Sequence, residues 1–197
     1  MKKSVQPNLD VLISQMSLDE KLAQMGSYWM FDLQSDGKLD PDKIGDKLKH
    51  GIGQISRPAG VTTFDPVNAA KANNYLQKFL VEQTRLGIPA IFHEECCSGA
   101  MVLGGTDFPQ MIGLASTFRP ELAEQMAAEI RTQLRAIGAR QGLAPVLDVS
   151  RDPRWGRVEE TFGEDPTLAS HFGVAYVRGL QGKSLNEKEI STCIRSF

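Results

Sequence analysis

The segment at 148–157, Asp-Val-Ser-Arg-Asp-Pro-Arg-Trp-Gly-Arg, combines three arginines, two aspartates and a tryptophan. An arginine presents a planar fork of donors that fits adjacent hydroxyls or a carboxylate, and Trp155 offers a flat apolar face. A sugar presents the matching surfaces, a rim of hydroxyls and a C–H face. The alternative is an Asp–Arg network that only braces a long loop, and composition favours neither. Asp148, directly after a predicted strand, is a further ligand-binding candidate.

A second group that could do chemistry is His93-Glu94-Glu95, at the end of another predicted strand. Paired acids at such a place bind hydroxyls or act in acid–base catalysis. We expect Glu95 to contact a ligand, and Glu94 to form a structural salt bridge with an arginine of the 151–157 loop. The pattern is not His-Glu-x-x-His and no second histidine follows at i+4, so no metal site is predicted.

The remaining reactive groups are weaker candidates. Arg57 follows an earlier predicted strand and either reaches a ligand or only forms a turn. Cys96 and Cys97 lie beside two acids, which raise the pKa of a thiol, so neither is predicted to be a nucleophile. Gly104-Gly105-Thr106 lacks the spacing of a phosphate-binding loop, and no dinucleotide-binding fingerprint is present. The sequence therefore predicts no cofactor.

These groups need elements that bring them together, and the chain alternates between helical and strand-like patterns. The residues that could do chemistry directly follow the predicted strands, whereas the residues before each strand show no comparable pattern. Such alternation predicts a parallel sheet with chemistry at its carboxyl-terminal edge, as in (β/α)₈ barrels. The predicted fold is thus α/β, the N-terminal part of a (β/α)₈ TIM-like barrel with about half of the strands. The expected helices begin at Ser17, Asp40, Pro66, Pro120 and Pro166, and the expected strands lie at 52–56, 88–92, 143–149 and 190–194, with 111–115 as a further short strand.

Composition narrows the class of protein. The chain has 197 residues, a formal net charge of -2 and 41% hydrophobic residues, as in globular proteins. The near-neutral charge argues against nucleic acid as a partner, and no apolar run approaches the length of a membrane span. The opening residues lack the apolar core of a secretory signal. Three sparse cysteines fit a reducing compartment, so a cytoplasmic location is predicted.

Several of these segments together resemble glycoside hydrolase family 3. The likeness rests on Arg-Asp-Pro-Arg-Trp-Gly-Arg at 151–157 and Glu-Thr-Phe-Gly-Glu-Asp-Pro at 160–166, supported by Leu-Gly-Ile-Pro-Ala-Ile-Phe-His-Glu-Glu at 86–95. It implies a (β/α)₈ N-terminal domain and retaining hydrolysis of β-linked sugars, as in β-glucosidases and β-xylosidases. It further implies that Glu95 and Arg157 bind the sugar. Arg195 stands where the family has the lysine of a Lys-His-Phe motif.

The resemblance leaves the reaction incomplete. Retaining hydrolysis needs a carboxylate nucleophile and a second carboxylate that acts as acid and base. The family's nucleophile lies in a Ser-Asp-Trp-like segment that has no match here, so no catalytic residue is assigned. We expect residues 1–197 to be a C-terminally truncated family domain that holds sugar-binding residues. The alternative is a non-catalytic carbohydrate-binding or assembly fragment. An unpaired strand edge would favour self-association or pairing with the missing barrel half.

Overall fold

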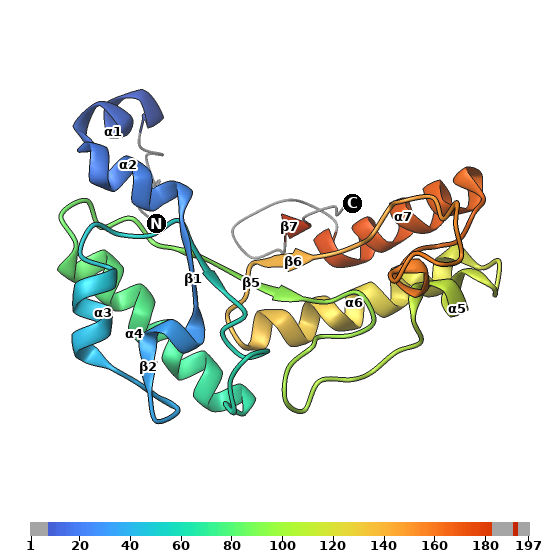
Figure 1. Cartoon of the computed structure of the whole chain (residues 1–197), viewed down its shortest axis with the longest axis horizontal. Coiled ribbons are helices and arrows are strands. Elements are labelled where there is room, and N and C mark those ends of the chain that lie inside the picture. The colour runs from blue at the N-terminus through green and yellow to red at the C-terminus, as the bar shows by residue number, and fades with distance from the viewer. Residues whose placement is uncertain (1–7, 183–190, 193–197) are drawn as a thin grey trace, which may run out of the picture.

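The computed structural model describes residues 8–182 and 191–192. Its centre is a five-stranded parallel sheet with helices packed around it, an incomplete barrel (Figure 1). The helices are α1 (Leu9–Gln15), α2 (Leu18–Met25), α3 (Pro41–Lys47), α4 (Pro66–Gln83), α5 (Met111–Ala115), α6 (Pro120–Ala136) and α7 (Pro166–Gln181), with 3-10 turns η1 (Met30–Leu33) and η2 (Val158–Glu160). The strands are β1 (Ser27–Trp29), β2 (Gln34–Ser35), β3 (Lys38–Leu39), β4 (Gln54–Ser56), β5 (Ile91–Glu95), β6 (Gln141–Leu143) and β7 (Ser191–Thr192).

The order of the strands in the sheet, β1-β4-β5-β6-β7, follows the order of the chain. The register pairs Ser56 with His93 and Glu95 with Leu143, so these neighbours reach the carboxyl-terminal edge together. A separate two-stranded antiparallel hairpin, β2–β3, leads into α3. The parallel sheet and the alternation of strands with helices confirm the predicted fold class.

Several predicted boundaries were wrong. The strand β1 was not predicted, and 111–115 is the helix α5 instead of a strand. The strand expected at 88–92 lies at 91–95, and the one expected at 143–149 ends at Leu143. Pro89 and Pro145 have no N–H to donate to a parallel ladder, which explains why continuous pairing begins after the first and is interrupted at the second, beyond which only an isolated bridge forms at Val146.

Side chains at the first turns explain where the helices begin. The Ser17 hydroxyl accepts from the Glu20 amide while the Glu20 carboxylate accepts from the Ser17 amide, which is a complete capping box. Asp65 and Asp165 cap α4 and α7, and each is followed by a proline in the first turn. These three starts are as predicted. Arg85, just beyond α4, pairs with Glu20 and so ties α2 to the body of the fold.

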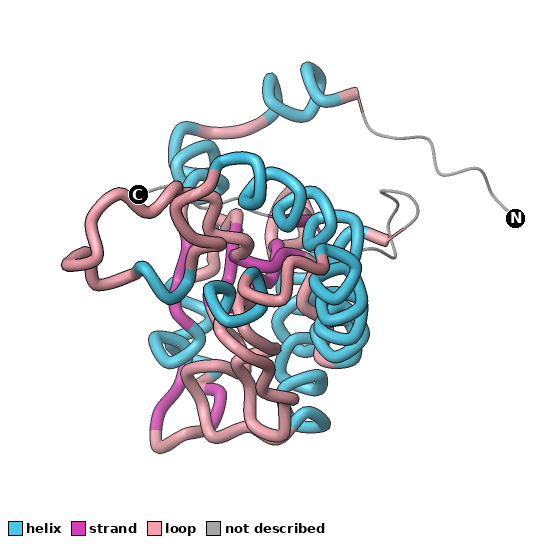
Figure 2. Tube along the Cα trace, turned by 90° about the vertical axis from the view of Figure 1, so that its right-hand side faces the viewer, coloured by secondary structure: helices cyan, strands magenta, loops and turns pink. Residues whose placement is uncertain are grey.

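The buried apolar side chains form two clusters. One lies where α3 and α4 pack on β4 and β5, and includes Ile44, Ile55 and Leu76. The other lies between α5, α6 and α7, and includes Ile130 and Phe172. Figure 2 shows the largest stack of helices on one side of the strands, while α1, which buries no residue, stands apart at the N-terminal end of the chain. None of the helices within residues 8–182 is long and apolar enough to cross a membrane.

Close approach of α6 and α7 depends on a glycine. A Cβ atom at Gly179 would lie 2.2 Å from the carbonyl oxygen of Glu124 and 2.8 Å from the Cβ of Ala127. Neither distance is compatible with a side chain at 179 unless the helices move apart. Tyr176 lies one turn earlier on α7, and its hydroxyl donates to the carbonyl of Cys96, directly after β5. The helix pair therefore supports the segment that follows the end of β5.

Candidate functional site

The carboxyl-terminal edge of the sheet collects most of the polar groups named above. Glu95 ends β5, Arg57 follows β4, and Asp148 lies a few residues beyond the end of β6. Because parallel strands end on the same side, these residues share one edge of the sheet. Arg195 lies outside the described residues, so its role stays a prediction.

Arg157 and Glu95 are the two residues predicted to bind a sugar, and Glu160 holds the guanidinium of Arg157 in place. Arg157 immediately precedes η2, and its guanidinium makes two hydrogen bonds to Glu160, from Nε to Oε1 at 2.8 Å and from Nη2 to Oε2 at 2.5 Å. This pairing raises the pKa of Arg157 above its ordinary value, and the negative charge of Glu95 contributes to the same rise. Both side chains are partly exposed. The edge therefore offers a carboxylate and a held guanidinium to a ligand.

The sequence did not reveal the role of Glu160. It lies three residues after Arg157 on a 3-10 turn, a spacing that brings side chains together. The spacing was the available signal, although Glu159 next to it is an equal acid by sequence alone. The bidentate pair fixes the plane of the guanidinium, which is the geometry that matters for binding a pair of hydroxyls.

The rest of the 148–157 segment contains an internal ion pair and lines a cavity. Arg154 donates from Nε and Nη2 to both carboxylate oxygens of Asp152, at 2.6 to 3.2 Å, and this pair is exposed. A cavity of about 290 Å³ lies beside it, lined by Asp148, Val149, Arg151, Asp152 and Trp155. The structure thus shows the bracing pair Asp152–Arg154 in this loop, and binding of a ligand in the cavity that Asp148 and Trp155 line stays a prediction.

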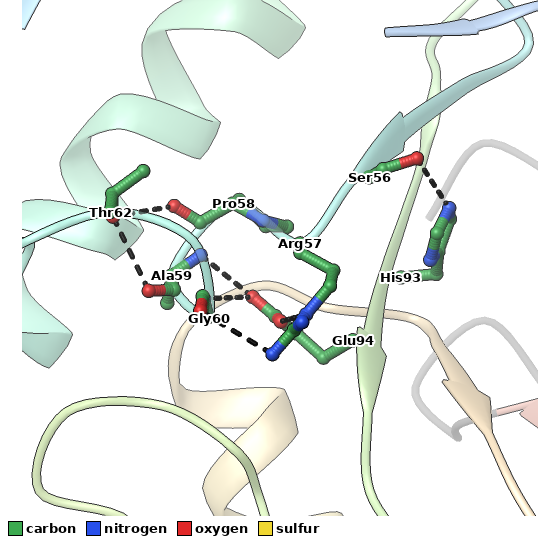
Figure 3. Close-up of polar contacts among 8 residues, drawn as sticks. All are labelled: Ser56, Arg57, Pro58, Ala59, Gly60, Thr62, His93 and Glu94. Atoms are coloured by element: carbon green, nitrogen blue, oxygen red, sulfur yellow. Dashed lines mark hydrogen bonds and ion pairs between the residues drawn. The ribbon is translucent and has the colours of Figure 1, made fainter. Parts of the chain in front are cut away.

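Glu94 is fully buried and does not pair with the 151–157 loop. Its Oε1 accepts from the backbone amides of Ala59 at 2.7 Å and Gly60 at 3.2 Å, and its Oε2 lies 4.0 Å from Nε of Arg57 (Figure 3). The expected structural salt bridge therefore exists, but its arginine is Arg57. Burial raises the pKa of Glu94 to about 7, although the two amides and Arg57 act in the opposite direction.

Arg57 is the residue where β4 turns into its loop. Its φ of 48° is in the left-handed region, which is uncommon for a residue with a side chain. The guanidinium points back to its own loop, where Nη2 lies 3.4 Å from the carbonyl oxygen of Gly60. About a fifth of the side chain is exposed. The structure thus places this weaker ligand candidate beside Glu94.

His93 belongs to a polar layer on the other side of β5. Its Nε2 lies 2.9 Å from the Ser56 hydroxyl, which lies 2.7 Å from the Ser27 hydroxyl, so the chain of contacts crosses β5, β4 and β1. Adjacent residues of a strand point to opposite faces, and Figure 3 shows His93 and Glu94 on opposite sides of β5. Within the part of the chain that the structure describes, no three His, Cys, Asp or Glu side chains gather as a metal site.

Cys96 follows Glu95 and is fully buried. Burial raises the pKa of its thiol far above the ordinary range, and the nearby charges of Glu95 and Glu94 raise it further. A thiol in this state is not a nucleophile at neutral pH. The prediction was made from the neighbouring acids, but burial is the larger cause.

Comparisons with known proteins give the site its context. The Glycosyl hydrolase family 3 N terminal domain matches residues 17–195. A putative β-xylosidase of Formosa agariphila is 37% identical over 183 residues, which is 91% of this chain and 24% of that protein. A periplasmic β-glucosidase/β-xylosidase of Dickeya chrysanthemi is 33% identical over 204 residues, covering 94% of this chain and 30% of that protein.

A solved structure agrees with these relatives. A β-glucosidase from Erythrobacter marinus superposes with a TM-score of 0.83 at 33% identity, and the match covers 94% of this chain and 25% of that one. The chain thus spans about a quarter to a third of the length of the proteins that it matches here.

Proposed function

Because the chain belongs to glycoside hydrolase family 3, we propose that it supplies sugar-binding residues of a retaining β-glycosidase, of the β-glucosidase or β-xylosidase type, within a longer enzyme. Glu95 accepts hydrogen bonds from sugar hydroxyls, and Arg157 donates to them. The observation that supports this assignment is that Glu95 ends β5 at the carboxyl-terminal edge of the sheet, and that its side chain and that of Arg157 are both partly exposed. Glu160 supports the proposal by fixing the guanidinium plane.

The hydrolytic step is assigned to residues that these 197 do not include. Retaining hydrolysis needs two carboxyl groups about 5–5.5 Å apart, one as nucleophile and one as acid and base. Glu94 is unsuited to either role because its carboxyl is buried behind β5 and held by backbone amides. Glu95 and Asp148 are proposed to contact the sugar without attacking it, with Trp155 as an apolar wall.

The binding claim is tested by titrating the chain with methyl β-glucoside and methyl β-xyloside in a calorimeter. Replacing Glu95 with Gln keeps the shape but removes the charge, and a lost charge-assisted hydrogen bond costs about 1.5–3 kcal/mol. We expect affinity to fall at least about tenfold. The affinity of Arg157→Lys should fall by a similar factor, because lysine cannot donate two parallel hydrogen bonds. Glu159→Gln, an exposed carboxylate in η2, is the matched control and should bind like the wild type.

Turnover of nitrophenyl β-glucoside and β-xyloside separates the two possible roles of the isolated chain. We expect no hydrolysis by this chain, because its carboxylates provide no nucleophile. Turnover that disappears in Glu95→Ala would overturn that part of the proposal. Binding without turnover agrees with the proposal. Hydrolysis that appears when the chain is combined with the remainder of a family 3 barrel would identify the chain as part of an enzyme. Its absence in that mixture would favour a carbohydrate-binding or assembly fragment.

The partners and the compartment are further parts of the proposal. We propose that the edge strand β1, which pairs only with β4 among the described strands, favours self-association or pairing with the other barrel half. A cytoplasmic location is proposed from the three cysteines, although one relative is named periplasmic. Light scattering tests the first proposal, and cell fractionation tests the second.

A further inference from the structure

The carboxyl group of Glu94 is buried next to Glu95, the residue that we propose binds the sugar. Glu95 is the next residue of β5 and is partly exposed, whereas the Glu94 side chain is completely inaccessible. Since neighbouring side chains of a strand alternate in direction, Glu94 projects away from Glu95 and toward the loop at 57–62 that follows β4 (Figure 3). A charged group in this position needs an explanation, because an apolar side chain would be cheaper to bury.

The contacts of Glu94 connect the ends of two strands. Oε1 accepts from both Ala59 and Gly60, so the carboxyl joins the loop after β4 to the end of β5. Oε2 makes no hydrogen bond to any described residue, and neither does the buried Nε of Arg57, 4.0 Å away. The distance is longer than the 2.7–2.9 Å of a charge-assisted hydrogen bond. The ion pair between Glu94 and Arg57 is therefore incomplete.

Gly60 occupies the space between the two partners. A Cβ atom at this position would lie 2.7 Å from Oε2 of Glu94 and 2.9 Å from Nη2 of Arg57. The carboxyl of Glu94 and the guanidinium of Arg57 thus both pack against Gly60, where a side chain would not fit. The loop is folded tightly against the carboxyl, and movement of the carboxyl or of Arg57 requires movement of the loop.

We propose that Glu94 is a positioning residue of the sugar site: by holding the 57–62 loop to the end of β5 and drawing Arg57 into that loop, it fixes Glu95 for the sugar. This inference rests on the proposed function, because it assumes that Glu95 binds a sugar. Glu94 itself does not touch the sugar. Its ionised form holds the loop more firmly than its neutral form, because a charged acceptor strengthens both amide hydrogen bonds and attracts the guanidinium.

The groups that act on the Glu94 carboxyl come from two segments, the loop after β4 and β5 itself. Arg57 and the amides of Ala59 and Gly60 belong to the loop after β4, and they favour the charged form. Glu95, on the same strand, disfavours it, and the Cys96 thiol responds to the charge of Glu94. Burial outweighs the favourable groups and raises the pKa to about 7. The charge therefore changes within a pH range where binding is easily measured.

The test measures the affinity of the full chain for methyl β-glucoside and methyl β-xyloside from about pH 5.5 to about pH 8.5, a range that brackets this pKa. We expect wild-type affinity to rise with pH by about fivefold or more, the low end of ordinary coupling between sites. Glu94→Gln should bind at every pH with the affinity that the wild type shows at the acidic end. Glu82→Gln, an exposed carboxylate on α4 that pairs with Lys78, should keep the wild-type profile.

A second variant decides the outcome if Glu94→Gln does not fold, as judged by circular dichroism. Arg57→Met retains Glu94 but removes the charge that lowers its pKa, so the rise in affinity should move to higher pH. A Glu94→Gln profile equal to that of the wild type, or an Arg57→Met profile with an unmoved midpoint, would overturn the inference. Absence of sugar binding by the wild type at every pH would instead overturn the proposed function, and the inference with it.

Discussion

Replacing Gly179 with alanine should destabilise the protein, although alanine normally favours a helix. In an unconstrained helix, Gly→Ala gains about 0.5–1 kcal/mol. At Gly179 the new methyl group would lie 2.2 Å from the carbonyl oxygen of Glu124 on α6, more than 1 Å inside an ordinary contact. Because that oxygen belongs to helix backbone, α6 and α7 must separate. Overpacking of this kind costs about 1–3 kcal/mol, which exceeds the gain in helix propensity.

The assay is urea unfolding at constant pH, followed by circular dichroism, with Gly45→Ala as the control. Gly45 lies inside α3, and no atom lies within 4 Å of the position that its Cβ would take. We expect Gly45→Ala to stabilise by about 0.5–1 kcal/mol and Gly179→Ala to lower the unfolding midpoint. In a melt, each lost kcal/mol lowers Tm by about 2–4 °C for a chain of this size. A Gly179→Ala midpoint at or above that of the wild type would refute the packing argument.

Three further perturbations follow from the structure. Ser17→Ala removes the hydroxyl that caps α2 and should cost about 1 kcal/mol in urea unfolding, whereas Ser17→Asp should cost much less. Phe172→Ala empties a fully buried site against Phe162, whose ring centroid is 5.5 Å away, and should cost about 3–5 kcal/mol; a loss below 1 kcal/mol would show that the site collapses. Wild-type stability should fall as pH rises from about 4.5 to about 7, because folding raises the pKa of Glu94 across this range and the folded state keeps the proton. The full loss is about 3 kcal/mol, and Glu94→Gln should abolish this part of the pH dependence in unfolding titrations.

Local signals made the helices predictable. Asp65-Pro66 and Asp165-Pro166 each combine a capping side chain with a proline that suits the first turn, and both helices begin at those positions. The strand β1 carries no comparable signal. Ser27–Trp29 is too short to show an alternating pattern, and it is extended because β4 lies beside it. Tertiary pairing of this kind leaves no mark on the local sequence.

The candidate site was chosen from the sequence in the same way. The family motifs point to Glu95 and Arg157, and composition points to the 148–157 loop, and the roles of these residues stay predictions. The partner of Glu94 was not identifiable, because several arginines are compatible with a buried acid until the fold shows which one is near. The Ala59 and Gly60 amides that hold Glu94 are backbone groups, and no residue type marks them. Motifs thus select candidate side chains but do not show which backbone groups hold them in place.

The strands of the parallel sheet lie side by side in the order in which the ribosome synthesises them. When β5 leaves the exit tunnel, its partner β4 has already been synthesised, and the same holds for β6 and β5. Each of β5, β6 and β7 pairs with the strand just before it, so the intervening loop to be closed contains one α-helix between β4 and β5 and between β6 and β7, and two α-helices between β5 and β6. The sheet can therefore grow one strand at a time during translation. We therefore expect nascent chains arrested shortly after α6 to protect β4 and β5 from protease.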